Sequence, residues 1–349
     1  MSDERQQRVR RLLDAARRIA DAEDVFGKRA RQVLVTTTGL SPEGVDLALR
    51  ECLEVNATDA ELDALVSGVT PTARAHVLLA ANVFVAPLRA IALALAQAPR
   101  VAVRASRREP TMATLLFEAS RGAFRLVEEL APSPGDHVWA YGSDDTLAAL
   151  RGELPAGVVL HGHGNGFGVA VLDAEAGELA AAAKALARDV ALFDQRGCLS
   201  PRVALVRGQP EGAQSFARAL AAGLAELQHD VPRGALSNSE ASDLTRYRDT
   251  MTYAGEVFHA GKGVVGLDLL GNVLLAPVGR NVHVTRVTDL SAALAGLGDA
   301  VAAVGISGPL ADVARKALPG ARQSPLGAMQ TPPLDGPVDR RPSAEGEVL

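Results

Sequence analysis

Cys198 is the side chain of this sequence best suited to covalent chemistry. It lies in Asp194-Gln-Arg-Gly-Cys-Leu-Ser-Pro-Arg, on a turn between a helix-like run and a β-like run. Gly197 lets the backbone turn tightly, which leaves a thiol accessible to a carbonyl carbon. A thiol with a pKa of about 8.5 is mostly protonated at neutral pH, so Arg196 and Arg202 are candidates to favour the thiolate. Cys198 is therefore a candidate nucleophile, and the alternative is a small hydrophobe packed at a turn.

The second cysteine and two histidines are weaker candidates for a chemical role. Cys52 lies in a helical pattern, Leu47-Ala-Leu-Arg-Glu-Cys-Leu-Glu, and we expect a packing role for it. His161 and His163 lie in a glycine-rich stretch, where an imidazole is either an acid–base group or structural. The sequence contains no Cys/His cluster with zinc spacing, so we expect no metal site.

Two glycine-containing segments are candidates for contact with phosphate. Gly162-His-Gly-Asn-Gly-Phe-Gly contains no G-x-G-x-x-G match, and the run after it is β-like, so close packing is favoured over a dinucleotide fingerprint. Tyr141-Gly-Ser-Asp-Asp-Thr-Leu leaves a β-like run and enters a helix, so Gly142, Ser143 and the helix amides can receive a pyrophosphate. The two aspartates repel phosphate, and an ordinary helix cap is the alternative.

Composition excludes several classes of protein. The 349 residues carry a formal charge of -5, which gives no general attraction to nucleic acid or an anionic membrane. Prolines and arginines interrupt the most apolar region, His76–Val103, so no membrane span is expected. The N-terminus is acidic and basic together and resembles no signal or transit peptide, and two cysteines suit a reducing compartment. We expect a cytoplasmic protein, and the predominance of arginine over lysine suggests a GC-rich bacterial genome.

Helix-like and β-like runs alternate around these turns. The first part of the chain predicts helices at Arg5–Ala30, Ser41–Val55, Asp59–Val66, Thr70–Ala81, Thr111–Leu130 and Asp145–Arg151, and strands at Arg100–Arg104, His137–Tyr141 and Val158–His161. The second part predicts strands at Arg202–Val206, Gly263–Leu269, Asn272–Leu275, Asn281–Val287 and Ala300–Gly305, and helices at Pro210–Gln228 and Leu290–Leu297. This alternation predicts an α/β protein with two domains, each with a mostly parallel sheet.

The expected boundaries follow from this pattern. Residues 1–186 should form an N-terminal helical segment with a dinucleotide-binding domain, and residues 187–329 the domain that carries Cys198. Residues 330–349 are rich in Pro, Gly and charge and should form a mobile tail. The arginine face of the first helix should be solvated.

The chain resembles the acyl-CoA reductases of the bacterial-luminescence fatty-acid reductase type, a branch of the aldehyde dehydrogenase superfamily. The resemblance spans about residues 75–340. Five segments carry it: Ala80-Ala-Asn-Val-Phe-Val-Ala-Pro-Leu-Arg-Ala, Val101-Ala-Val-Arg-Ala-Ser-Arg-Arg-Glu-Pro, Tyr141-Gly-Ser-Asp-Asp-Thr, the Cys198 segment and Gly327-Ala-Met-Gln-Thr-Pro-Pro. An aldehyde-dehydrogenase-like fold with a Rossmann-like cofactor domain and a catalytic domain is implied.

The resemblance also implies roles for individual residues. Cys198 would be the nucleophile, and the Asn82 amide with the Cys198 backbone N–H would form the oxyanion hole. Arg104 and Ser106 would contact the adenosine ribose or its phosphate, and the Gly142–Ser143 turn the pyrophosphate. An arginine at position 104 favours a 2′-phosphate and hence NADPH, with NADH as the alternative.

One departure from the superfamily bears on the reaction. Oxidative aldehyde dehydrogenases use a glutamate to activate water, and here His161 stands near that place. A reductase discharges its acyl-enzyme with hydride and needs no such water, so the resemblance implies reduction of an acyl-CoA thioester to a fatty aldehyde, with His161 as a candidate proton relay. The acyl donor would be acyl-CoA or an acylated partner protein, and the protein would be a homo-oligomer.

Two other functions remain open from the residues. A cysteine acyltransferase or thioesterase would use the same acyl-enzyme without a nucleotide. A non-catalytic relative would serve as a subunit of a larger assembly, and phosphate-activated acyl groups are a further substrate class. Dependence of activity on NAD(P)H separates the reductase from these alternatives.

Overall fold

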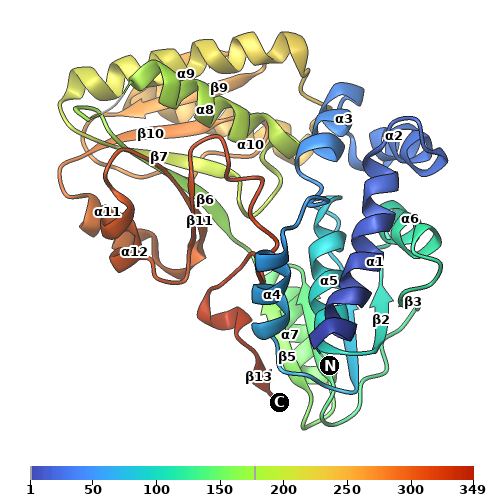
Figure 1. Ribbon diagram of the computed structural model, residues 1–349. Coiled ribbons are helices and arrows are strands. Elements are labelled where there is room, and N and C mark those ends of the chain that lie inside the picture. The colour runs from blue at the N-terminus through green and yellow to red at the C-terminus, as the bar shows by residue number, and fades with distance from the viewer. Residues whose placement is uncertain (1, 177) are drawn as a thin grey trace. The chain divides into compact units, whose positions relative to one another are not determined.

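The computed structural model describes residues 2–176 and 178–349, which form two compact units (Figure 1). Unit 1 comprises residues 1–38, 45–165 and 333–349, and unit 2 comprises residues 39–44 and 166–332. Each unit is built around one twisted sheet, six-stranded in unit 1 and seven-stranded in unit 2. The α/β fold with two mostly parallel sheets is therefore confirmed.

The sheet of unit 1 has the strand order β13-β5-β4-β1-β2-β3. Its strands are β1 (Arg74–Leu78), β2 (Arg100–Arg104), β3 (Arg125–Leu126), β4 (His137–Tyr141), β5 (Val159–His163) and β13 (Glu347–Val348). All pairs are parallel except β13 with β5. The chain moves outward from β1 in both directions, so the connections reverse between β1 and β4. Ligands of open α/β sheets bind at the carboxyl ends of the strands at such a reversal.

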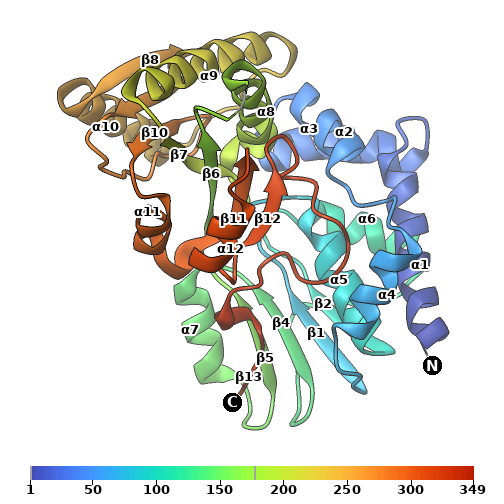
Figure 2. The same cartoon turned by 60° about the vertical axis from the view of Figure 1, so that its left-hand side comes forward.

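Helices cover both faces of this sheet (Figure 2). The helices that contact its strands are α5 (Ala86–Gln97), α6 (Thr111–Ala119), α7 (Asp144–Glu153) and the short helix η3 (Pro342–Ala344). Helices α1 (Ser2–Ala20), α2 (Val25–Thr38) and α4 (Asp59–Ser67) pack on α5 or α6, and α3 (Pro42–Glu51) begins in unit 2 and ends in unit 1. Leu147 of α7 packs on Val138, Ala140 and Leu160 of the sheet. Every residue of α5 from Pro87 to Gln97 is buried, which accounts for the apolar stretch of sequence there by core packing.

Three arginines on one face of α1, expected to be solvated, bind backbone carbonyls of the protein; Arg5 and Arg8 are half-buried and Arg11 is exposed. Arg5, Arg8 and Arg11 follow each other at spacings of three, which places them on the same side of the helix. Their guanidinium groups donate to backbone carbonyls at or just beyond the C-terminal ends of three other helices. The acceptors are Val66 in α4 and Val69 after it, Leu95 and Ala96 in α5, and Ser120 and Arg121 after α6. The last carbonyls of a helix have no partner within that helix, and a cation near them also complements the helix dipole. Helix α1 is therefore hydrogen-bonded to the C-terminal regions of three other helices.

The sheet of unit 2 has the strand order β12-β11-β6-β7-β10-β9-β8, with β8 antiparallel. Its strands are β6 (Phe167–Asp173), β7 (Pro201–Arg207), β8 (Glu256–Ala260), β9 (Gly263–Asp268), β10 (Val282–Val287), β11 (Val301–Ser307) and β12 (Arg322–Pro325). The helices are α8 (Leu179–Ala191), α9 (Pro210–Asp230), α10 (Asn238–Ala254), α11 (Leu290–Leu297) and α12 (Ala311–Ala317), with the short helices η1 (Leu192–Gln195) and η2 (Gly298–Ala300).

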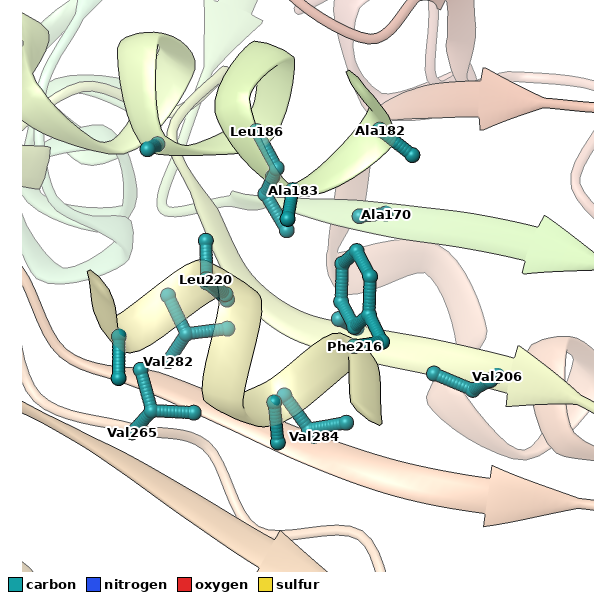
Figure 3. Close-up of a cluster of buried hydrophobic side chains, with 14 of the residues drawn as sticks. Ala170, Ala182, Ala183, Leu186, Val206, Phe216, Leu220, Val265, Val282 and Val284 are labelled. Carbon is teal, nitrogen blue, oxygen red and sulfur yellow. The ribbon is translucent and has the colours of Figure 1, made fainter. Parts of the chain in front are cut away.

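The central strands of this sheet are buried on both faces. On one face, Phe216 and Leu220 of α9 and Leu186 of α8 pack against side chains such as Val206 of β7 and Val284 of β10 (Figure 3). On the other face, α11 and α12 pack against Val169, Val171, Val203 and Leu205. A strand buried on both faces is continuously apolar, which is why β7 and β10 are recognisable in the sequence.

Four predicted elements differ from the structure. The helix predicted at Thr111–Leu130 ends at Ala119, and the chain then forms strand β3 at Arg125–Leu126. The strand predicted at Asn272–Leu275 is a loop without regular structure.

The helix predicted at Arg5–Ala30 is divided into α1 and α2, because the carboxylates of Asp21 and Asp24 accept hydrogen bonds from backbone amides two residues ahead and form turns. The helix predicted at Thr70–Ala81 is strand β1, whose residues pair with β2 on one side and β4 on the other. The spacing of apolar residues in this short run suits either element, and burial between two strands decides it.

The boundaries also differ from those expected. Position 186/187 lies within α8, whereas the compact units change at 165/166, between β5 and β6. Residues 333–349, expected as part of a mobile tail, belong to unit 1: β13 pairs with β5, and buried Arg89 donates to the carbonyls of Pro333 and Gly336. Pairing satisfies the backbone groups of this polar segment, which its composition alone does not reveal.

Candidate active site

Cys198 lies on a tight turn that leads into β7. The N–H of Ser200 donates to the carbonyl of Gly197 at 3.0 Å, which closes a turn with Cys198 and Leu199 at its centre. Gly168, near the start of β6, donates its N–H to the Ser200 carbonyl, and a Cβ at Gly168 would overlap the carbonyl of Leu199. Cys198 is half-buried, whereas Cys52 is buried in α3's C-terminal turn. The thiol therefore lies at the amino ends of β6 and β7 on a backbone that is held from both sides; we call residues 197–200 the nucleophile turn.

The backbone just before the nucleophile turn is strained. Phe193, Asp194 and Gln195 have φ angles of 55°, 48° and 65°, in the left-handed region that non-glycine residues rarely occupy. Each such residue costs about 1–3 kcal/mol and persists only where its surroundings hold it. This conformation reverses the chain between α8 and the nucleophile turn.

A buried ion pair holds the strained residues. Asp194 is 1% exposed, and its Oδ1 accepts from Nε of Arg280 at 2.8 Å, while Oδ2 accepts from the N–H of Gly234 at 2.9 Å. The Asp194 carbonyl accepts from the N–H of Gly279, and Arg280 also donates to the carbonyl of Val231. Arg196 adds a second cation 3.9 Å from the Asp194 carboxylate. Charge-assisted hydrogen bonds such as that between Arg280 and Asp194 make a buried ion pair tolerable.

Gln195 provides a second attachment to the same loop. Its amide donates to the carbonyls of Pro201 at 2.8 Å and Asn281 at 2.7 Å, and its Oε1 accepts from the N–H of Asn281. Gln195 is 1% exposed, so these bonds form without competition from water. The nucleophile turn is thereby tied to residues 279–281.

The two arginines flanking the turn are engaged elsewhere. Arg196 pairs with Glu240 at 2.9 Å and donates to the carbonyl of Ala235, and Arg202 donates to the carbonyl of Ala276. A guanidinium paired with a carboxylate favours a nearby thiolate less than a lone cation does. These contacts give both arginines a role in holding neighbouring segments in unit 2.

The other candidate residues lie in unit 1, after the carboxyl ends of three adjacent strands. Asn82 is exposed in the connection between β1 and α5, Arg104 and Ser106 end β2, and Gly142 and Ser143 connect β4 to α7. This edge is where the connections of the sheet reverse, so the five residues share the place at which α/β sheets bind ligands. The structure thus brings the sequence candidates of unit 1 to one edge.

A family model and solved structures agree with this architecture. The model of the acyl-CoA reductase (LuxC) family matches residues 124–301, just over half of the chain. The chain belongs to the LuxC acyl-CoA reductase family. A comparison with curated proteins gave no significant match.

Solved structures similar to this LuxC-family chain include an oxidoreductase and several aldehyde dehydrogenases. An oxidoreductase from Marinobacter aquaeolei is 12% identical with a TM-score of 0.73, over 99% of this chain and 82% of its own. A NAD-dependent benzaldehyde dehydrogenase from Corynebacterium glutamicum is 16% identical with a TM-score of 0.65, over 94% and 80%. Lactaldehyde dehydrogenase from Escherichia coli is 16% identical with a TM-score of 0.63, over 90% and 76%. At these identities, the similarity establishes the fold.

In this LuxC-family chain, the contacts within the β4–α7 turn are those of an ordinary capped helix N-terminus. The hydroxyl of Ser143 accepts from the N–H of Thr146 and caps α7. The carboxylate of Asp144 turns towards the glycine-rich loop, where it accepts from the N–H of Asn165 at 3.0 Å and leaves no room for a Cβ on Gly164. Close packing of this loop is confirmed, and Asp145 remains exposed at the helix N-terminus.

The end of β2 is positively charged on its accessible side. Arg107 and Arg108 are exposed and Arg104 is half-buried, whereas Glu109 is buried and its Oε1 accepts from the N–H of Thr111 at the start of α6. Burial raises the pKa of Glu109. Dinucleotide folds specific for NAD place a carboxylate on the ribose 2′-hydroxyl here, and those that accept a 2′-phosphate place arginine nearby. The accessible groups of this segment match the second pattern.

His161 is part of a ladder of rings on β4 and β5. Its ring stacks on Trp139 at 3.9 Å between centroids, and His163 stacks on Tyr141 at 4.4 Å. The carboxyl-terminal segment covers the ladder: Asp339 lies 3.8 Å from His163, and a Cβ on Gly346 would lie 2.7 Å from the His161 ring. Within the described residues, no three His, Cys, Asp or Glu side chains are grouped as metal ligands.

Polar contacts connect the ladder to the side chain of Gln97. The indole N–H of Trp139 donates to Oε1 of Gln97, so the Gln97 amide donates to Nδ1 of His137. The same Nδ1 atom lies 2.9 Å from Nε2 of His161, whose ring stacks on that of His137. His161 is 8% exposed, and burial lowers its pKa to about 4. These contacts favour a neutral structural imidazole over the proton relay that the sequence suggested.

His161 should make the protein sensitive to acid. Its pKa is about 4 in the folded chain against 6.5 in the unfolded chain, so the unfolded state binds more protons between these values. The free energy of unfolding should fall by about 3 kcal/mol as the pH drops from 6.5 to 4. In urea titrations at several pH values, His161→Phe, which keeps a ring against Trp139, should flatten this dependence. The exposed His229→Phe control should retain it, and an equally steep dependence in both variants would refute the assignment.

Sequence reasoning did not identify the groups that hold the nucleophile turn. Asp194 and Gln195 stand within the quoted Cys198 segment, but their partners Arg280 and Asn281 are 86 residues away in sequence. The usable signal was the pairing of acidic and amide side chains directly before a turn that contains one glycine.

Among the described helices, none combines the length and apolar character that crossing a bilayer requires.

Proposed function

We propose that this protein reduces an acyl-CoA thioester to an aldehyde with NADPH, through an acyl-enzyme on Cys198. The observation that carries the proposal is the nucleophile turn: a half-buried thiol on a backbone fixed by Asp194, Gln195 and Gly168. A nucleophile must be accessible and held at one position to attack an acyl carbon. Membership of the acyl-CoA reductase family supports the choice of substrate.

The first half of the proposed reaction uses the chain's own groups. The Cys198 thiolate attacks the thioester carbonyl carbon, and the carbon–sulfur bond to CoA breaks in the collapse of the tetrahedral intermediate. CoA leaves as the thiol after taking a proton, and Cys198 carries the acyl group. The Asn82 amide and the Cys198 N–H are proposed to donate to the oxyanion, where one such donor is worth about 2.7–4 kcal/mol.

The edge of the unit-1 sheet fits a bound dinucleotide. The α7 N-terminus offers backbone amides, and Arg104, Arg107 and Arg108 supply positive charge after β2. When bound there, NADPH would supply the hydride that converts the acyl-thioester carbonyl to the aldehyde as Cys198 leaves. One thioester and one NADPH with a proton then give one aldehyde, free CoA and NADP⁺. The absence of a glutamate at position 161 suits this outcome, because no water needs to be activated.

The function is tested by following NADPH absorbance with a series of acyl-CoA chain lengths and trapping the product as a hydrazone. We expect consumption that requires acyl-CoA and yields an aldehyde in equal amount. Release of CoA and carboxylate without consumption of NADPH or NADH would identify a thioesterase, and acyl transfer to an added thiol would identify an acyltransferase. Either result would refute the reductase. Activity only with an acylated carrier protein would move the donor from CoA to that partner.

Arg104 should determine the preference for NADPH. In Arg104→Ala the 2′-phosphate loses a charge-assisted partner, so the KM for NADPH should rise about tenfold or more. NADH has no such phosphate and serves as the internal control, so its KM should change little. Initial rates with both nucleotides at saturating acyl-CoA measure the ratio. Equal effects on the two values would show that Arg104 does not read the 2′-phosphate.

A further inference from the structure

A second buried carboxylate of unit 2 lies behind the nucleophile turn. Asp189, in the last turn of α8, is fully buried. Its Oδ2 accepts from the N–H of Gly327 at 2.6 Å and its Oδ1 from the N–H of Met329 at 3.0 Å. Both oxygens are acceptors, which is the pattern of an ionised carboxylate. Asp189 therefore holds the backbone of the segment 327–330 through hydrogen bonds to its amides.

The segment 327–330 reaches the nucleophile turn directly. The amide of Gln330 donates to the hydroxyl of Ser200 at 3.4 Å, inside the unit. Ser200 is the residue whose N–H closes the turn around Cys198 and whose carbonyl accepts from Gly168. Met329 packs into the space above Gly168, where a Cβ would lie 2.9 Å from its methyl group. A continuous set of contacts thus runs from the Asp189 carboxylate to the residue that shapes the turn.

We propose that Asp189 and Gln330 are positioning residues for Cys198: the carboxylate of Asp189 fixes residues 327–329, and the amide of Gln330 fixes Ser200 and with it the nucleophile turn. The inference rests on the proposed function only in taking Cys198 as the nucleophile. It does not depend on the acyl donor or on the nucleotide.

Protonation gives this role a signature that packing alone lacks. Burial raises the pKa of Asp189 to about 7, against the opposing effect of the three amides of residues 327, 329 and 330 and of Arg188, the charged neighbour on α8. A proton removes the negative charge and makes its oxygen a weaker acceptor, so the hydrogen bonds from these amides weaken. The segment 327–330 should be held firmly above pH 7 and less firmly below it.

The probe is p-nitrophenyl acetate, which acylates an activated cysteine without any need to recognise CoA or NADPH. The burst of p-nitrophenol, followed at its isosbestic wavelength, gives the acylation rate of Cys198 from pH 5.5 to 8.5. Division by the thiolate fraction, measured by ultraviolet absorbance against Cys198→Ala, removes the ionisation of the thiol itself. For the wild type we expect the corrected rate to rise through a step near pH 7.

Asp189→Asn should lose the step and acylate on the order of tenfold more slowly at pH 8, because small displacements of a nucleophile have effects of this size. Gln330→Ala leaves the carboxylate in place and should also slow the burst. The double variant should be no slower than Asp189→Asn, because both act through one route. Asp173→Asn is the matched control: Asp173 also accepts a backbone N–H, from Glu175, but lies at the opposite end of β6. It should keep both the rate and the step.

The outcomes separate this inference from the proposed function. A wild-type step and rate in folded Asp189→Asn would overturn the positioning role, as would a normal burst in Gln330→Ala. If Asp189→Asn fails to fold, judged by circular dichroism, the burst of Gln330→Ala decides alone. An Asp189-dependent burst in a protein that never consumes NADPH with acyl-CoA would support the inference and refute the reductase.

Discussion

Cys198→Ala is expected to lower acyl-CoA-dependent NADPH consumption by at least about four orders of magnitude, because it removes the sulfur to which the acyl group is transferred. The fold should be unaffected, since the side chain is half-buried and small. Stopped-flow absorbance measures the consumption of NADPH, and mass spectrometry of the intact protein after mixing with acyl-CoA measures the acyl adduct. The wild type should gain the mass of one acyl group, and the variant none.

Cys52 provides the matched control for this variant. It is buried at the end of α3, within a helical pattern. Cys52→Ala should keep the acyl adduct and the rate of the wild type, with at most a modest loss of stability from the small volume removed. Substantial NADPH consumption by Cys198→Ala, or an acyl adduct on Cys52, would contradict the proposed nucleophile.

Asp194→Ala should be the most damaging single change to the stability of unit 2. It leaves the guanidinium of Arg280, itself 2% exposed, without its carboxylate, and such a broken buried pair costs roughly 3–5 kcal/mol. It also removes the acceptor of the Gly234 N–H and releases the strained backbone of Phe193–Gln195. Urea unfolding followed by circular dichroism measures the loss.

The control for this variant is an ion pair with the same chemistry at the surface. Asp312 pairs with Arg315 one turn along α12, and its side chain is 84% exposed. Asp312→Ala should leave the free energy of unfolding nearly unchanged, because exposed pairs contribute little. If Asp194→Ala were as mild as Asp312→Ala, the buried pair would not be what holds the turn.

Local pattern sufficed for the parts of the fold whose chemistry is local. β4 at His137–Tyr141 and α11 at Leu290–Leu297 have the predicted bounds, because each combines a clear period with flanking turn or cap residues. Strand β1 was predicted as a helix because its identity depends on β2 and β4, which follow some 25 and 60 residues later. No window of sequence around Arg74–Leu78 contains that information.

The candidate site also combines features that are local in sequence with features that depend on distant residues. Cys198 could be singled out from its glycine turn, but the ion pair that positions it joins Asp194 to Arg280 across 86 residues, and Asp189 acts on a segment some 140 residues later. His161 shows the converse: a loop histidine suggested acid–base chemistry, and only the stacked rings of Trp139 and the covering segment reveal a buried imidazole. Residue type indicates which chemistry is possible, and partners distant in sequence determine which is used.

The divided sequence of unit 1 has a consequence for synthesis on the ribosome. Nearly all of unit 2 is translated between residues 166 and 332, whereas the strand that covers β5, β13, is translated after it. Arg341, which donates to the carbonyls of Gly164 and Asn165, also arrives late. A nascent chain can therefore complete its second unit before its first. During that interval β5 presents an unpaired edge and an uncovered imidazole ladder, the kind of surface that recruits chaperones or promotes aggregation.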